Sequence, residues 1–326
     1  MGYLYAACVA LVFILTVAAL RVLIPKLRSM KMGQKILDIG PRWHKSKEGT
    51  PTMGGIAFAV PVIIVTALAL VIAPVLGVDI PTAPVLLTLL LAAGNGAIGV
   101  IDDLTKFRKK QNEGLTAPQK YALQLAMAGA FLALLRLYGT PDTAVAIPFT
   151  DIKLELGWFY YVFALIFITG IINSVNLTDG IDGLASSVTL VVAVFLSVLG
   201  FTYAKQDAAL LGGVAVGATL GFLVYNFYPA RVFMGDTGSL FLGGIVAGAA
   251  FVIDSPLCIA LAGVVYICEA MSDIIQVGVY KLTHKRVFKM APIHHHFEKC
   301  GWSEKKIVFV FSAVTLLASV AAYFGY

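Results

Sequence analysis

Charge is scarce in this 326-residue chain, because Asp, Glu, Lys and Arg make up only 13% of it. A soluble domain carries about twice that share, so the composition excludes an ordinary soluble protein. Hydrophobic residues account for 59%, and the mean hydropathy is +0.89. The sequence therefore predicts a polytopic membrane protein. Its formal charge of +6 reflects orientation in the bilayer and anionic lipid, and we expect no nucleic-acid partner.

Cysteine is also rare. The four cysteines stand far apart without a CxxC pair, which indicates neither a disulfide framework nor a cysteine zinc site. The first twenty residues carry no charge, and they lack both the basic segment and the clear cleavage site of a signal peptide. We therefore expect the chain to begin with a retained helix.

Long apolar runs are abundant. About 20 apolar residues span a bilayer, and ten segments reach or approach that length. We expect a single all-α membrane domain, residues 1–326, with spanning helices at about 1–22, 53–73, 82–101, 118–138, 157–175, 184–204, 208–226, 237–254, 256–280 and 306–325. The ninth segment contains Glu269 and Asp273, so we expect it to bend or to leave the bilayer.

Lys and Arg are unevenly distributed between the connections. The odd-numbered connections hold 21 of the 24 Lys and Arg residues. Because positive charge is retained in the cytoplasm, this bias predicts ten helices with both termini outside and the odd-numbered connections in the cytoplasm. The outer connection 140–155 alternates apolar and polar residues around Pro148, which predicts a small β-hairpin between the fourth and fifth helices.

A polar island at residues 173–183 separates the fifth and sixth helices. It contains no Lys or Arg, and charge beside hydrocarbon usually serves a function. Its polar residues recur every three positions and drift by about 60° per step on a helix, so they cannot share one helical face. They are Asn173, Asn176, Asp179 and Asp182. Gly180 and Gly183 indicate a helix-to-loop transition that curls these side chains around a substrate.

Further acids stand at the same predicted face. Asp102 and Asp103 end the third helix; adjacent carboxylates imply a cation, a nearby lysine or a raised pKa, although a solvated helix end also fits. Asp236 lies in a glycine-containing turn that opens the eighth helix and offers N–H groups to a phosphate, and an N-cap is its alternative role. Hard carboxylate oxygens suit Mg²⁺ with substrate phosphates. Together the acids predict a metal-assisted diphosphate site. A lipid transporter is the alternative, although transporters place such acids nearer the midplane.

Three consecutive histidines, His294, His295 and His296, lie in the ninth connection. Neighbours diverge by about 100° on a helix, so we do not expect all three to hold one zinc ion. Donors to phosphate or sugar oxygens fit better, with a metal role for one histidine as the alternative. Nearby, Glu269, Asp273 and Gln276 share one helix face, where a structural polar pairing and ligand contact both remain open.

Five motifs stand out along the chain: Gly49–Gly55, Ile101–Asp103, Asn173–Gly183, Phe233–Ser239 and Met290–Glu298. Together they resemble the polyprenyl-phosphate N-acetylhexosamine-1-phosphate transferase superfamily and, within it, the bacterial phospho-N-acetylmuramoyl-pentapeptide transferase family. The triple histidine is specific to the pentapeptide branch, while the related GlcNAc-1-phosphate transferases share the aspartates.

The resemblance implies an enzyme of the bacterial inner membrane whose active site faces the cytoplasm. It would transfer phospho-MurNAc-pentapeptide from UDP-MurNAc-pentapeptide to undecaprenyl phosphate, giving lipid I and UMP in peptidoglycan synthesis. Mg²⁺ and a homodimer are implied as well. A polyprenyl-phosphate GlcNAc-1-phosphate transferase is the alternative enzyme.

The resemblance also implies roles for individual residues. Asp236 would be the metal ligand and would act with Asp102, Asp103, Asp179 and His294 in catalysis. Lys120 would contact the lipid phosphate. The remaining substrate-binding residues would be Lys47, Thr52, Asn173, Asn176, Asp182, Asn226, Phe233, Gln276, His295 and His296.

Two mechanisms remain open for such a reaction. A phosphate monoester has a second pKa of about 6 and is largely dianionic at neutral pH, so the lipid phosphate is itself a nucleophile. We expect direct in-line attack, with Asp102 removing any residual proton. A covalent intermediate on Asp179 is the alternative.

Overall fold

The computed structural model describes residues 2–30, 47–109, 111, 113–138 and 143–326, and almost all of its regular structure is helical. A short 3₁₀ helix, η2 (Ala73–Leu76), continues α2. The α-helices are α1 (Gly2–Ser29), α2 (Ile56–Ile72), α3 (Thr82–Lys109), α4 (Ala117–Leu137), α5 (Phe159–Thr178), α6 (Leu184–Thr202), α7 (Gln206–Asn226), α8 (Gly235–Val252), α9 (Pro256–Ala262), α10 (Val264–Thr283), α11 (Ile293–Lys299) and α12 (Glu304–Phe324).

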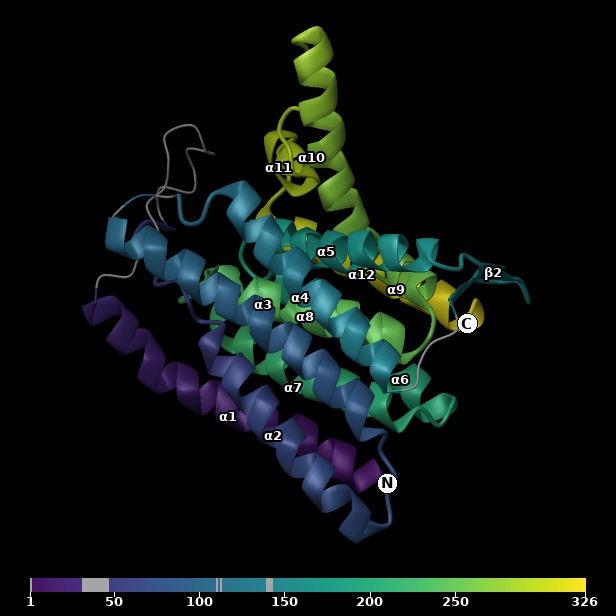
Figure 1. The fold of residues 1–326 in the computed structure, drawn as a ribbon. Coiled ribbons are helices and arrows are strands. Elements are labelled where there is room, and N and C mark those ends of the chain that lie inside the picture. Colours follow the sequence, from purple (N-terminus) through teal and green to yellow (C-terminus); the bar gives the residue numbers. More distant parts are fainter. Residues whose placement is uncertain (1, 31–46, 110, 112, 139–142) are drawn as a thin grey trace.

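The prediction of an all-α polytopic membrane protein is confirmed. In the described ranges, nine helices are long and apolar enough to span a membrane, and the α9–α10 pair makes a tenth if it is one span. This pair is bent by 82°, in agreement with the bend expected of the ninth segment. Figure 1 shows α10 projecting from the bundle with α11 beside it. The exact number of spans and the placement of both termini outside stay predictions.

Helix α3 is longer than its sequence pattern predicted, because it runs through Asp102 and Asp103 to Lys109 instead of ending near residue 101. The Lys106 ammonium group lies 2.7 Å from Asp102 Oδ2, one helical turn away. This ion pair neutralises charge on the last turns of the helix and favours its continuation. The two aspartates therefore stand within the helix and not at its end.

The centre of the bundle is α8, which is buried along most of its length and packs closely against α3. Small residues permit this close approach, as they do in many membrane helix pairs. At Gly99 of α3, an added Cβ would overlap the backbone carbonyl of Asp236 in the first turn of α8. The missing side chain at Gly99 thus brings the end of α3 against the start of α8.

Two short strands, β1 (Ala144–Ala146) and β2 (Lys153–Glu155), pair antiparallel with Val145 opposite Leu154. The N-terminus, the C-terminus and β2 lie toward one end of the bundle (Figure 1). The backbone N–H of Phe149 donates to the Gly325 carbonyl at 3.0 Å and links this region to the C-terminus. Its location on the outer side of the membrane remains a prediction.

Candidate functional site

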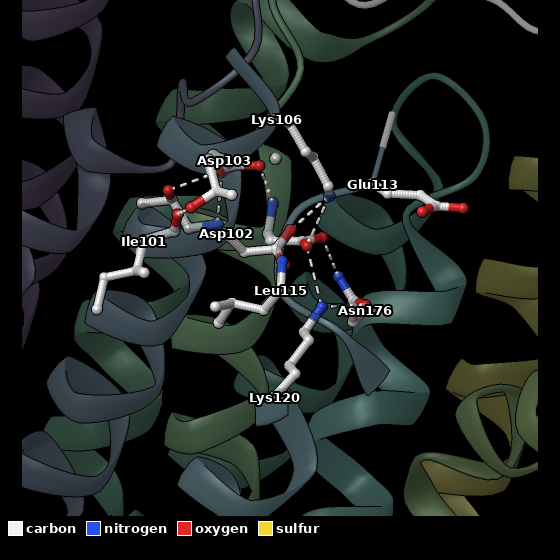
Figure 2. Close-up of polar contacts among 12 residues, drawn as sticks. Ile101, Asp102, Asp103, Lys106, Glu113, Leu115, Lys120 and Asn176 are labelled. Carbon is white, nitrogen blue, oxygen red and sulfur yellow. Dashed lines mark hydrogen bonds and ion pairs between the residues drawn. The ribbon is translucent and has the colours of Figure 1, made fainter. Parts of the chain in front are cut away.

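Three carboxylates meet where α3 approaches α8. Asp102, Asp103 and Asp236 each place one oxygen within 4.8 Å of the others. Lys106 Nζ lies 2.8 Å from Asp236 Oδ2, and Lys120 Nζ of α4 lies 2.9 Å from the same oxygen. Figure 2 shows both lysine side chains extending toward this cluster from different helices. The structure thus confirms the predicted gathering of these acids and supplies lysines as their cationic partners.

Asp103 caps helix α8. Its carboxylate accepts hydrogen bonds from the backbone N–H groups of Asp236 and Thr237 at 3.3 and 3.0 Å, and from the Thr237 hydroxyl at 2.8 Å. These N–H groups belong to the first turn of α8, where helices lack internal acceptors. The alternative role of Asp236 as an N-cap is therefore wrong. Since Asp103 satisfies these donors, the Asp236 carboxylate can face the two lysines.

The island at 173–183 changes from helix to turn as predicted. Helix α5 continues to Thr178, α6 begins at Leu184, and Gly183 between them has a φ of +77°. Asn176 is therefore helical, one turn before the break. Its amide nitrogen donates to Asp236 Oδ1 at 2.8 Å, which joins the island directly to the carboxylate cluster.

Asn173 forms a reciprocal amide pair with Gln124 of α4. Asn173 Nδ2 donates to Gln124 Oε1 at 2.7 Å, and Gln124 Nε2 donates back to Asn173 Oδ1 at 3.3 Å. Lys120 lies one turn before Gln124, and Lys120 Nζ contacts Asn176 Oδ1 at 3.4 Å. The Asn173–Gln124 pair therefore fixes α4 against α5 and positions Lys120. The motifs did not include Gln124, although an amide within an apolar helix was a usable signal.

Asp179 follows the last residue of α5. Loss of water around its carboxyl group raises its pKa well above the usual range, and the negative charges of Asp236, Asp103 and Asp182 raise it further. Burial and like charge both disfavour the ionised form. A cation bound beside Asp179 would lower the pKa of this carboxyl group.

Asp182 has a positive partner, Lys47, which comes from the segment before α2. Lys47 Nζ lies 2.7 Å from Asp182 Oδ1 and 2.6 Å from Glu304 Oε2 at the start of α12. The other Asp182 oxygen accepts from the Ala230 backbone N–H at 2.8 Å. The island, which contains no Lys or Arg, thus receives a cation from a distant segment. Glu304 belongs to the same group of ion pairs, and no sequence motif indicated it.

The three consecutive histidines diverge on α11 as predicted. Each ring uses Nδ1 toward a different partner, so the rings do not converge on one point. His294 pairs with Glu269 of α10, His295 pairs with Glu298, and His296 accepts from the Lys289 backbone N–H, at 2.9, 2.6 and 3.1 Å respectively.

His294 lies against the island. It is fully buried, and its Nε2 atom has no hydrogen-bond partner in the part of the chain that the structure describes. A Cβ added at Gly180 would overlap the imidazole ring. The buried Glu269 carboxylate holds the opposite side of this ring, so of the two roles left open for Glu269 the structure shows a polar pairing.

Thr52 and Phe233 are brought together by backbone pairing of two loops. The Phe233 N–H donates to the Pro51 carbonyl at 2.8 Å, and the Gly54 N–H donates to the Phe233 carbonyl at 2.9 Å. This pairing places both residues beside the first turn of α8. Phe233 is half-buried.

Asn226 and Gln276 use their amides to hold backbone segments. Asn226 Nδ2 donates to the Val232 carbonyl at 3.0 Å, and its oxygen accepts from Ser186 at 3.0 Å. Gln276 Oε1 accepts from the N–H groups of residues 287 and 288 at 3.0 and 2.9 Å. The structure thus shows both amides supporting loops, and their substrate contacts remain a proposal.

Known proteins resemble this chain over most of its length. The sequence profile of glycosyl transferase family 4 matches residues 84–254, and phospho-N-acetylmuramoyl-pentapeptide-transferase signature 1 matches residues 47–58. Proteins named phospho-N-acetylmuramoyl-pentapeptide-transferase are similar over nearly the whole chain. The one from Clostridium perfringens strain 13 is 45% identical, covering 93% of this chain and 92% of its own. The one from Bacillus cytotoxicus is 45% identical, covering 99% and 98%. The one from Clostridioides difficile strain 630 is 43% identical, covering 96% and 94%. On this similarity, the chain belongs to the phospho-N-acetylmuramoyl-pentapeptide transferase family.

Proposed function

We propose that this protein transfers phospho-MurNAc-pentapeptide from UDP-MurNAc-pentapeptide to undecaprenyl phosphate, giving lipid I and UMP. The observation that carries the proposal is the meeting of Asp102, Asp103 and Asp236 with Lys106 and Lys120, in a chain of this family. Such a cluster places carboxylates and ammonium groups together at one end of apolar helices, where phosphates could bind. A nucleotide donor and a lipid acceptor both require that location.

The cluster suits a Mg²⁺ ion. Its three carboxylates offer hard oxygen donors within 4.8 Å of one another, which is the chemistry that Mg²⁺ prefers. Asp103 is committed to capping α8, and Asp102 Oδ1 accepts from the Leu115 backbone N–H at 2.8 Å, so Asp236 would be the principal ligand. When bound, the ion would neutralise charge on the reacting phosphates. The ammonium groups of Lys106 and Lys120, which now contact Asp236, could then turn toward phosphate oxygens.

The chain's own residues would align two anions for direct attack. An oxygen of the lipid phosphate attacks the phosphorus atom of the diphosphate that is nearer the sugar. The bond from that phosphorus to the oxygen that bridges the two phosphorus atoms breaks, and UMP leaves with the bridging oxygen. Lys120 would hold the lipid phosphate, and Asp102 would accept a residual proton from it. His294, whose Nε2 has no partner in the described ranges and whose ring lies against Gly180, would contact the sugar-nucleotide donor. Alignment of the reactants and neutralisation of their charge account for most of the rate enhancement in enzymatic phosphoryl transfer.

The location and assembly follow the same proposal. We place the protein in the bacterial inner membrane as a single transferase domain over residues 1–326, with the carboxylate cluster facing the cytoplasm, where 21 of 24 Lys and Arg residues would lie. We also propose a homodimer, on the strength of the family resemblance.

UMP release tests the proposed reaction. Purified protein with undecaprenyl phosphate and Mg²⁺ is expected to release UMP from UDP-MurNAc-pentapeptide, and EDTA is expected to stop the release until Mg²⁺ is restored. UDP-GlcNAc serves as the matched donor. Release from UDP-GlcNAc alone would establish the alternative transferase, and release from neither donor would reject both.

Isotope exchange tests direct attack. Without undecaprenyl phosphate, labelled UMP is not expected to enter UDP-MurNAc-pentapeptide, because no intermediate would form on the protein. The same preparation must be active when the lipid is added. Exchange without the lipid would instead support a covalent intermediate on Asp179.

A further inference from the structure

Glu304 joins three segments that are distant in the sequence. It opens α12, directly after Ser303, whose hydroxyl accepts from the Lys306 backbone N–H at 3.3 Å. One oxygen, Glu304 Oε2, accepts from Lys47 Nζ at 2.6 Å and from the Asp182 backbone N–H at 3.1 Å. A carboxylate is also favoured at a helix N-terminus by the helix dipole. A single side chain thus connects the segment before α2, the island and α12.

The contacts of Glu304 are largely shielded from water. The side chains of Lys47, Asp182 and Glu304 are 14%, 2% and 9% exposed. Removing Glu304 would leave Lys47 paired with Asp182 alone, so the ammonium group would lose its link to the start of α12. Two carboxylates share the one ammonium group, so the position of Lys47 depends on both of them.

The effect of Glu304 extends to the loop that carries Phe233. Asp182 Oδ2 accepts from the Ala230 N–H at 2.8 Å, three residues before Phe233. Glu304 holds both the backbone of Asp182 and the cation that pairs with its side chain. A shift of Glu304 would therefore displace Lys47, the island turn and the 230–233 segment together.

We propose that Glu304 is a positioning residue for the nucleotide-sugar donor, acting through Lys47 and Asp182. This inference rests on the proposed function, in which those two residues bind the donor. Among the described contacts of Glu304, none reaches Asp102, Asp103 or Asp236. We therefore expect Glu304 to act mainly on donor binding, because its described contacts reach neither the carboxylate cluster nor Lys120.

The variant Glu304→Gln tests this role, since it keeps the size and one carbonyl acceptor but removes the charge. The KM for UDP-MurNAc-pentapeptide is expected to rise about tenfold, the scale of losing one charged hydrogen bond. The kcat and the KM for undecaprenyl phosphate are expected to stay near wild type, because a change that weakens only donor binding raises the donor KM and leaves kcat unchanged. Glu304→Ala, which removes both acceptors, is expected to raise the donor KM further. Glu155→Gln, the same change at an exposed position on β2, is the matched control.

A double variant shows whether Glu304 acts through Lys47. If it does, Glu304→Gln adds little to the donor KM once Lys47→Gln is present, because coupled residues are not additive. Full additivity would overturn the coupling.

An unchanged or lower donor KM in Glu304→Gln would overturn the proposal. So would a parallel change in kcat and both KM values with a lower melting temperature, which marks a merely structural role. If the wild-type protein releases no UMP, the proposed function itself is rejected. If the wild-type protein releases UMP and the variants have a normal donor KM, only the role of Glu304 is rejected.

Discussion

Asp236→Asn is expected to lower the rate of UMP release by about 10³-fold, the upper range for losing one group that stabilises charge in a transition state. Asp236 is the carboxylate on which the site converges: its Oδ2 contacts Lys106 and Lys120, and its Oδ1 accepts from Asn176. Asparagine keeps the shape but loses the charge that would bind Mg²⁺. The initial rate of UMP release at saturating donor, lipid and Mg²⁺ measures the effect.

The control for Asp236 is Asp254→Asn. Asp254 is 61% exposed and pairs with Lys205 at 3.2 Å in the connection between α8 and α9. The same loss of charge there is expected to leave UMP release near the wild-type rate, since exposed ion pairs contribute about 0–1 kcal/mol. A folded Asp236→Asn protein that keeps wild-type activity would remove Asp236 from the proposed metal site.

Gly99→Ala is expected to damage both stability and activity. The new methyl group would overlap the Asp236 carbonyl, so α3 and α8 would have to separate. Overpacking of this kind costs about 1–3 kcal/mol, and a misplacement of about 1 Å in a catalytic site lowers the rate by about 10²-fold. We therefore expect a lower melting temperature together with a similar loss of UMP release.

Gly129→Ala makes the same change where there is room. Gly129 lies in α4, and no atom lies within 4 Å of a Cβ placed there. Both the melting temperature and the activity are expected to remain near wild type. Equal behaviour of the two alanine variants would show that close approach at Gly99 does not hold the carboxylates together.

Features that depend on neighbouring residues were predictable from the sequence. Apolar runs marked the membrane segments because the bilayer sets their length. Glycines at 180 and 183 marked the end of α5, because glycine tolerates the positive φ that Gly183 adopts. The divergence of His294, His295 and His296 followed from helical geometry alone. The extension of α3 was not foreseen, because the apolar pattern ends near residue 101, although the Asp102–Lys106 pair beyond it spans only four residues.

Composition, apolar runs and motifs were sufficient to identify the membrane class, the candidate acids and the family. The partners of those acids could be read only from the packing of the helices. This packing assigned Asp103 to the start of α8, Lys106 and Lys120 to Asp236, and the Lys47–Glu304 pair to Asp182. Each of these partnerships joins residues from distant segments. Spacing along a chain constrains only near neighbours, whereas the choice among distant partners depends on how closely whole helices pack.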